Sequence, residues 1–130
     1  SDGGQSQLIA CNSDGRLRMA GQEVFRWAVE HMPALGLAAC KRAGVGIDEI
    51  EVFVPHQANL RIIDAVARKL GLRHAVVATD ISSSGNTSAA SIPIALSRLL
   101  ERGEARAGQL ALLLGFGAGL SYAGQVVVVP

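Results

Sequence analysis

Two polar side chains and one glycine-rich segment suggest that this chain acts on a carbonyl group. His56 follows the apolar run "EVFVP", Asn86 follows the loop "SSSG", and "GFGAG" occupies residues 115–119. A neutral imidazole and a carboxamide donate hydrogen bonds without carrying charge, and glycines leave backbone N–H groups open to close approach. Donors of these kinds stabilise an oxyanion or enolate on a thioester or ketone oxygen when they surround the same atom.

The pattern of apolar residues predicts that these segments meet at one edge of a sheet. Helical crossovers make the middle strands parallel, and a short glycine-rich turn makes the last two strands an antiparallel hairpin. Ligands of open α/β sheets bind outside the carboxyl ends of the strands, where all three segments fall. The predicted strands are 7–11, 51–55, 75–81, 109–116 and 121–130, and the predicted helices are 22–43, 59–72 and 87–103.

This order of elements predicts an α/β fold with a mixed, mainly parallel five-stranded sheet, crossover helices and a C-terminal antiparallel hairpin. The length of 130 residues suits one domain. Two prolines interrupt predicted helices. Pro33 is expected to kink or split the first helix, and Pro93 to cost the last helix a hydrogen bond and bend it.

The composition argues against several classes of partner. The net charge is +1 and no basic run is interleaved with aromatic residues, so nucleic acid is not expected. No apolar stretch reaches the ~20 residues of a membrane span, so no membrane is expected either. Cys11 and Cys40 have no metal-binding spacing, and two such thiols suggest a reducing, cytoplasmic setting.

Each segment taken singly has an ordinary structural interpretation. His56 suits a solvated strand-to-helix connection, Asn86 a turn or helix cap, and residues 115–119 a tight hairpin turn. A dinucleotide-binding glycine turn is excluded because the residues after Gly119 are too few and read as a strand. The coincidence of all three segments on one edge favours a functional site, although neither cysteine is well placed as a nucleophile.

Longer motifs around these residues resemble one enzyme family. The segments "VPHQANLRI" (54–62) and "GNTSAASIPIAL" (85–96) are similar to β-ketoacyl-acyl carrier protein synthase III, the condensing enzyme that starts bacterial fatty acid synthesis. The interval of 30 positions between His56 and Asn86 agrees with that family. The segments "MAGQEVFRWAV" (19–29) and "LLLGFGAGLSYAGQVV" (112–127) extend the resemblance, in the right order, over nearly the whole chain.

The resemblance implies that residues 1–130 are the carboxyl-terminal, thiolase-like domain of a larger enzyme. In this family the nucleophilic cysteine belongs to the amino-terminal half, and nothing in this sequence matches it. That expectation accounts for a start without Met and predicts that the fragment alone is inactive. It also implies a homodimer whose substrates are acyl-CoA and acyl carrier protein thioesters, with no separate cofactor and no metal.

Site residues follow from the resemblance position by position. His56 and Asn86 would bind the thioester carbonyl of malonyl-acyl carrier protein and stabilise the enolate left by carbon dioxide. The backbone N–H of Ala118, between Gly117 and Gly119, would contribute to the oxyanion hole of the acyl-enzyme. Family members often have glycine in place of Ala118, but the backbone donor survives this change.

The resemblance also implies a tunnel and a docking surface. Gly21, Ala58 and Asn59 match positions that line the pantetheine tunnel, and Phe25 falls near its wall. On the helix 59–72, Arg61 and Arg68 share a face that Lys69 flanks. A solvated face is the ordinary interpretation, and the resemblance makes these cations a candidate dock for the acidic carrier protein. The residues concerned are Gly21, Phe25, Ala58, Asn59, Arg61, Arg68 and Lys69.

Two alternatives remain open from the sequence. A priming ketosynthase of aromatic polyketide biosynthesis shares these motifs, and the choice of acyl chain depends largely on residues outside this sequence. A non-catalytic module that binds coenzyme A or a phosphopantetheine arm would explain why no nucleophile is found.

Overall fold

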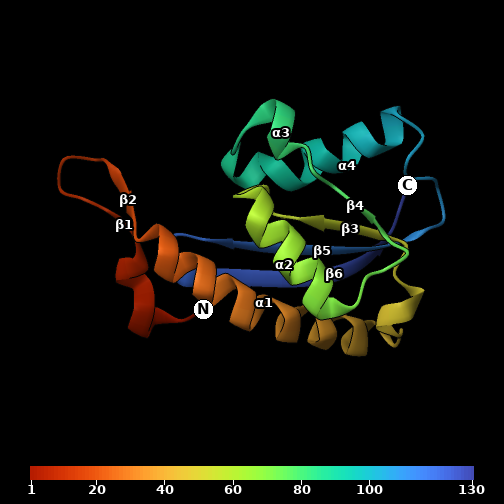
Figure 1. Cartoon of the computed structure of the whole chain (residues 1–130), viewed down its shortest axis with the longest axis horizontal. Helices are drawn as coiled ribbons and strands as arrows, with labels where there is room; N and C mark the ends of the chain where they lie inside the picture. The colour runs from red at the N-terminus through yellow and green to blue at the C-terminus, as the bar shows by residue number, and fades with distance from the viewer.

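A four-stranded sheet with helices on both faces forms the centre of the molecule (Figure 1). The computed structural model describes residues 1–130, and its sheet order is β4-β3-β5-β6. β3 pairs in parallel with both β4 and β5, whereas β5 and β6 form an antiparallel hairpin, as predicted. The strands of this sheet are β3 (Val52–Pro55), β4 (Val76–Val77), β5 (Leu110–Gly117) and β6 (Ser121–Val128).

Helices α1 and α2 cover one face of the sheet and α4 covers the other (Figure 1). α2 ends at Gly71, whose φ of 74° is a left-handed conformation that glycine adopts without strain. Short 3-10 turns lie at Gly3–Leu8, Ile47–Glu49, Ser88–Ala90 and Ala118–Leu120. The helices are α1 (Gly21–Ala43), α2 (Leu60–Leu70), α3 (Ile81–Ser84) and α4 (Ser91–Glu101).

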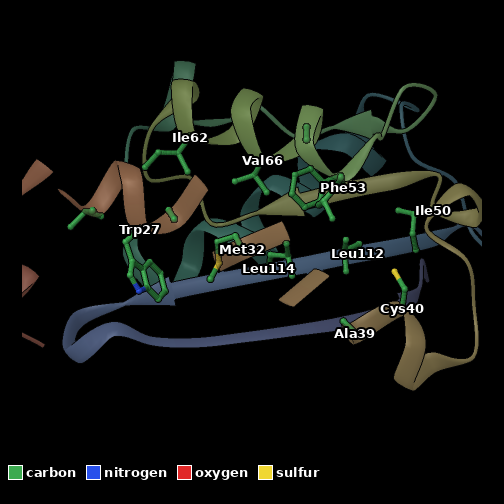
Figure 2. Packing of buried hydrophobic residues seen from close by; sticks show 14 of the residues in the cluster. Trp27, Met32, Ala39, Cys40, Ile50, Phe53, Ile62, Val66, Leu112 and Leu114 are labelled. Carbon is green, nitrogen blue, oxygen red and sulfur yellow. The ribbon is translucent and has the colours of Figure 1, made fainter. Parts of the chain in front are cut away.

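The alternation of side chains along β3 produces two hydrophobic cores. Phe53 packs into the core beneath α1 and α2, and its neighbours Val52 and Val54 pack into the core beneath α4. Figure 2 shows Trp27 and Met32 of α1 in the larger core, which Leu112, Leu114 and Val66 also join. Burial on both faces explains why β3 and β5 contain no polar side chain.

The prediction of five strands in one sheet is wrong, although the α/β class is confirmed. β1 (Ile9–Cys11) pairs instead with β2 (Leu17–Met19) in a separate two-stranded ribbon. The turn between these strands contains Gly15 at φ 76°, which brings Leu17–Met19 back beside Ile9–Cys11. The predicted strands do not include residues 17–19, so the sequence did not indicate this ribbon.

The predicted strand 75–81 is also shorter in the structure, because a side chain takes over its last backbone groups. Gln57 is 1% exposed, and its Nε2 donates to the carbonyls of Pro55 (2.8 Å) and Ala78 (3.2 Å). Its Oε1 accepts from the N–H of Ile81 at 3.0 Å. β4 therefore ends at Val77, and α3 begins at Ile81 within the segment predicted as strand and loop.

Pro33 does not split its helix, and Pro93 does not remove a hydrogen bond from its helix. Pro33 lies inside a single helix, so α1 is not split in two. Pro93 is the third residue of α4, where an N–H has no intrahelical acceptor, so no helical hydrogen bond is lost. The helix begins later than predicted because Ser88–Ala90 forms a separate 3-10 turn.

A close approach between α1 and β6 depends on Gly124. A Cβ at this position would lie 2.7 Å from Cδ2 of Leu114 and 3.2 Å from Cγ of Leu35. Gly124→Ala is therefore expected to lower the free energy of unfolding by about 1–3 kcal/mol, which is the usual cost of overpacking. Gly3→Ala, where nothing lies within 4 Å, is the matched control. Urea denaturation measures both variants, and equal stability would mean that α1 moves aside freely.

Candidate functional site

A cavity of about 530 Å³ lies at the edge of the sheet that was predicted to carry the site. Its lining combines the carboxyl ends of β3 and β5, the segment after α3, the start of α1 and the β1–β2 ribbon. The ribbon and the start of α1 lie at the same end of the sheet as the β5–β6 turn (Figure 1). Predicted site residues that line the cavity are Gly21, Phe25, His56, Ala58, Asn59, Asn86, Gly117 and Ala118.

His56 is held at this edge by contacts with both backbone and side chains. Its backbone N–H donates to the carbonyl of Leu114 on β5 at 2.7 Å. Its ring nitrogen Nδ1 lies 2.6 Å from Oγ of Ser91. The ring of Phe116 meets the imidazole edge-on, with centroids 5.6 Å apart. Burial lowers the pKa of His56 below its usual value, so the imidazole is neutral at pH 7.

The carboxamide of Asn86 has a fixed orientation. Its Oδ1 accepts a hydrogen bond of 2.9 Å from the N–H of Ser88. A backbone N–H only donates, so this contact identifies the oxygen end and leaves the NH₂ group free of protein partners. Asn86 therefore performs the turn role that its position suggested and still offers a donor to the cavity.

The glycine-rich segment forms a strand end and a tight turn, and it opens no helix of the dinucleotide-binding kind. Gly117 is extended and is the last residue of β5, and Gly119 adopts φ 70° within the turn Ala118–Leu120. Ala118 is exposed and lines the cavity. Gly119 does not line the cavity, so its part is to shape the turn that presents Ala118.

The start of α2 forms another part of the cavity wall. Asn59 caps this helix, because its Oδ1 accepts from the N–H of Arg61 at 2.9 Å. The guanidinium of Arg61 lies over the ring of Phe25, 5.6 Å from the centroid. Arg68 and Lys69 are exposed in the last turn of the same helix and do not line the cavity. Only Arg61 of the three predicted docking cations contacts a cavity residue.

Three neighbours of the predicted residues were missed by sequence reasoning. Ser91 contacts His56 across 35 positions of the chain, and Phe116, which packs against His56, lies between two glycines that alone suggested a role for this segment. Ser88 orients Asn86 through a backbone N–H, which no side-chain pattern reveals. Small polar residues in "TSAAS" were the one available signal, and they suit helix starts as well as sites.

The two cysteines do not belong to the site. Cys11 is exposed on β1, and Cys40 is buried in the core, where burial raises the pKa of its thiol. Neither lines the cavity. No group of three or more His, Cys, Asp or Glu residues is arranged to hold a metal ion, and no helix is both long and apolar enough to cross a bilayer.

Comparison with known proteins gives a consistent result. Residues 40–129 match the family model of the carboxyl-terminal part of 3-oxoacyl-[acyl-carrier-protein] synthase III. The chain is 55% identical over 115 residues to β-ketoacyl-[acyl-carrier-protein] synthase III 4 of Streptomyces coelicolor. The aligned segment covers 88% of this chain and 36% of that protein. The chain thus spans a little over a third of the length of this relative.

Solved structures agree with the sequence comparison. The crystal structure of 3-oxoacyl-(acyl carrier protein) synthase III from Pseudomonas aeruginosa PAO1 matches with a TM-score of 0.94 and 37% identity, over 100% of this chain and 43% of that one. The priming β-ketosynthase from the R1128 polyketide biosynthetic pathway matches with a TM-score of 0.93 and 43% identity, over 99% and 42%. The chain belongs to the 3-oxoacyl-acyl carrier protein synthase III family, has its thiolase-like fold, and corresponds to its carboxyl-terminal part.

Proposed function

We propose that residues 1–130 are the carboxyl-terminal domain of an enzyme that condenses an acyl-CoA primer with malonyl-acyl carrier protein. The product would be a 3-oxoacyl-acyl carrier protein that initiates fatty acid synthesis. One observation carries this proposal beyond the family assignment. His56 and Asn86 come from separate loops and line one cavity, the contact of His56 with Ser91 uses Nδ1 and leaves Nε2 for a ligand, and the contact of Asn86 with Ser88 leaves its NH₂ donor.

The chemistry follows from these two donors. His56 Nε2–H and Asn86 Nδ2–H would bind the carbonyl oxygen of the malonyl thioester. When the bond to the carboxylate breaks and carbon dioxide leaves, the electron pair forms an enolate whose charge rests on that oxygen. The enolate carbon then attacks an acyl thioester carbon, a C–C bond forms, the C–S bond breaks and the thiolate leaves. The backbone N–H of Ala118 would hydrogen-bond the oxyanion formed on the acyl group.

The acyl group requires a nucleophile that this domain does not place in the cavity. Neither Cys11 nor Cys40 lines it, and the S. coelicolor relative is almost three times as long as the matched segment. We therefore infer that a preceding amino-terminal half supplies a cysteine at the open side of the cavity. The amino-terminal half and this carboxyl-terminal domain would together form the complete active site.

Assay of the full-length enzyme tests this function directly. Acyl-CoA and malonyl-acyl carrier protein carrying a labelled free carboxylate should yield labelled carbon dioxide and a 3-oxoacyl-acyl carrier protein. Residues 1–130 alone should release no label. A full-length protein that binds the thioesters but neither decarboxylates nor condenses them would instead be the non-catalytic module.

The polyketide alternative is tested by the choice of carrier protein. The R1128 priming ketosynthase is 43% identical to this chain, the same identity as the synthase III of Thermus thermophilus, so sequence similarity to these two structures does not separate the roles. Rates measured with carrier proteins from a fatty acid system and from an aromatic polyketide system distinguish the two roles. A strong preference for the polyketide carrier would assign the chain to priming of that pathway.

The exposed cations of α2 provide a test of carrier-protein docking. Arg68→Glu should lower kcat/KM for malonyl-acyl carrier protein about 3- to 10-fold at low salt, because a rim charge acts mainly on the association rate. The loss should shrink as salt is added. Arg106→Glu reverses another exposed charge, in the loop between α4 and β5, and is the control. Equal effects of both reversals would remove α2 as the dock.

A further inference from the structure

A buried hydroxyl group lies against the imidazole of His56. Ser91, the first residue of α4, is 1% exposed, and its Oγ lies 2.6 Å from His56 Nδ1. The same Oγ lies 3.2 Å from the backbone nitrogen of Gln57. Both contacts join α4 to the loop after β3, although Ser91 and His56 are 35 positions apart.

Counting donors and acceptors decides which way these two hydrogen bonds run. The N–H of Gln57 only donates, so it uses a lone pair of the Ser91 oxygen. The hydroxyl proton of Ser91 then has His56 Nδ1 as its remaining partner. If Nδ1 carried the proton instead, the oxygen would accept twice and its own proton would be buried without a partner, which is unfavourable.

We propose that Ser91 is a positioning residue that holds His56 as the neutral Nε2–H tautomer, so that the imidazole donates its proton into the cavity. Nδ1 accepts from Ser91, and the ring proton therefore resides on the opposite nitrogen. The effect of Ser91 on decarboxylation rests on the proposed function. The tautomer of His56 can be measured without any turnover.

The position of Ser91 is itself well fixed. α4 is anchored in the second core by Ala95 and Leu99, which are 0% and 1% exposed. One turn beyond Ala95, Nε of Arg98 lies 3.3 Å from Oδ1 of the buried Asp80. A hydroxyl on such an anchored helix defines the orientation of a ring on a loop more closely than another loop residue would.

Nitrogen NMR of the full-length enzyme with ¹⁵N-labelled histidine tests the tautomer. The wild-type spectrum should show an unprotonated Nδ1 and a protonated Nε2 for His56, assigned by comparison with His56→Ala. Ser91→Ala should give a mixture of tautomers and a decarboxylation rate about 10- to 100-fold lower, by analogy with the loss of a group that orients a metal-binding histidine. Its KM should change little, and Ser91→Thr, which keeps the hydroxyl, should restore most of the rate.

The outcomes separate this inference from the proposed function. Protonated Nδ1 in the wild-type enzyme overturns the role of Ser91, and this result does not depend on the folding of any Ser91 variant. The role is also overturned if Ser91→Ala changes neither tautomer nor rate while His56→Ala is inactive. If the wild-type tautomer is as expected but His56→Ala decarboxylates normally, the positioning stands and the proposed function fails. Ser97→Ala, on the exposed side of α4, is the control for a serine lost from the helix.

Discussion

His56→Ala is expected to slow decarboxylation of malonyl-acyl carrier protein about 10²–10³-fold in the full-length enzyme, which is the usual effect of losing one oxyanion donor. The imidazole is neutral, half-buried and packed against Phe116, so the variant loses an uncharged donor whose position is already fixed. Acylation of the cysteine by acyl-CoA should suffer less, because that step uses a different oxyanion site. Labelled carbon dioxide and labelled acyl-enzyme measure the two steps separately.

A second histidine provides the control for this substitution. His74 is exposed and follows the end of α2, away from the cavity lining. His74→Ala should leave both steps unchanged. Normal decarboxylation by His56→Ala, or equal losses in acylation and decarboxylation, would contradict the assignment of His56 to the enolate.

Asn86→Asp is expected to have an effect at least as large, about 10³-fold on decarboxylation. The substitution keeps the oxygen that accepts from the N–H of Ser88, so the loop geometry is preserved. It replaces the NH₂ donor by a carboxylate oxygen, and a negative charge then faces the enolate that must form. The rate of carbon dioxide release under saturating substrate measures the effect on the chemical step.

Comparison of Asn86→Asp with Asn86→Ala isolates the contribution of charge. The alanine variant loses the donor alone, so it should be slow but faster than the aspartate variant. Asn12→Asp adds the same charge in the turn between β1 and β2, outside the cavity lining, and should behave as wild type. An aspartate variant as active as the wild-type enzyme would show that Asn86 does not face the reacting oxygen.

The convergence of the site was predictable because it depends on local patterns. The runs 51–55 and 109–116 contain β3 and β5, whose side chains enter the cores on both faces of the sheet. The amphipathic helix between Asn59 and Gly71 is the crossover that makes β3 and β4 parallel. The carboxyl ends of parallel strands lie at one edge of the sheet, so the loops that follow them meet there regardless of their side chains. His56 and Ala118 therefore had to lie at the same edge once the elements were correct.

The contacts that refine the site were not predictable, since each joins residues far apart in the chain. No local pattern indicates that Ser91 binds an imidazole 35 positions earlier, or that Gln57 ends β4 by bonding to Ala78 and Ile81. Pro93 was placed wrongly for a related reason. The helix start depends on a 3-10 turn at Ser88–Ala90, and the residues there also suit an α-helix.

The buried amide of Gln57 has a consequence for motion at the cavity. It bonds to the backbone before His56 and to the backbone on both sides of Asp80, in the segment that leads to Asn86. We therefore expect the two loops to be displaced together when the sheet edge fluctuates, because the Gln57 side chain is hydrogen-bonded to both. The distance between the His56 imidazole and the Asn86 carboxamide should then vary less than the position of either group. The spacing of the two donors is therefore set before substrate binds.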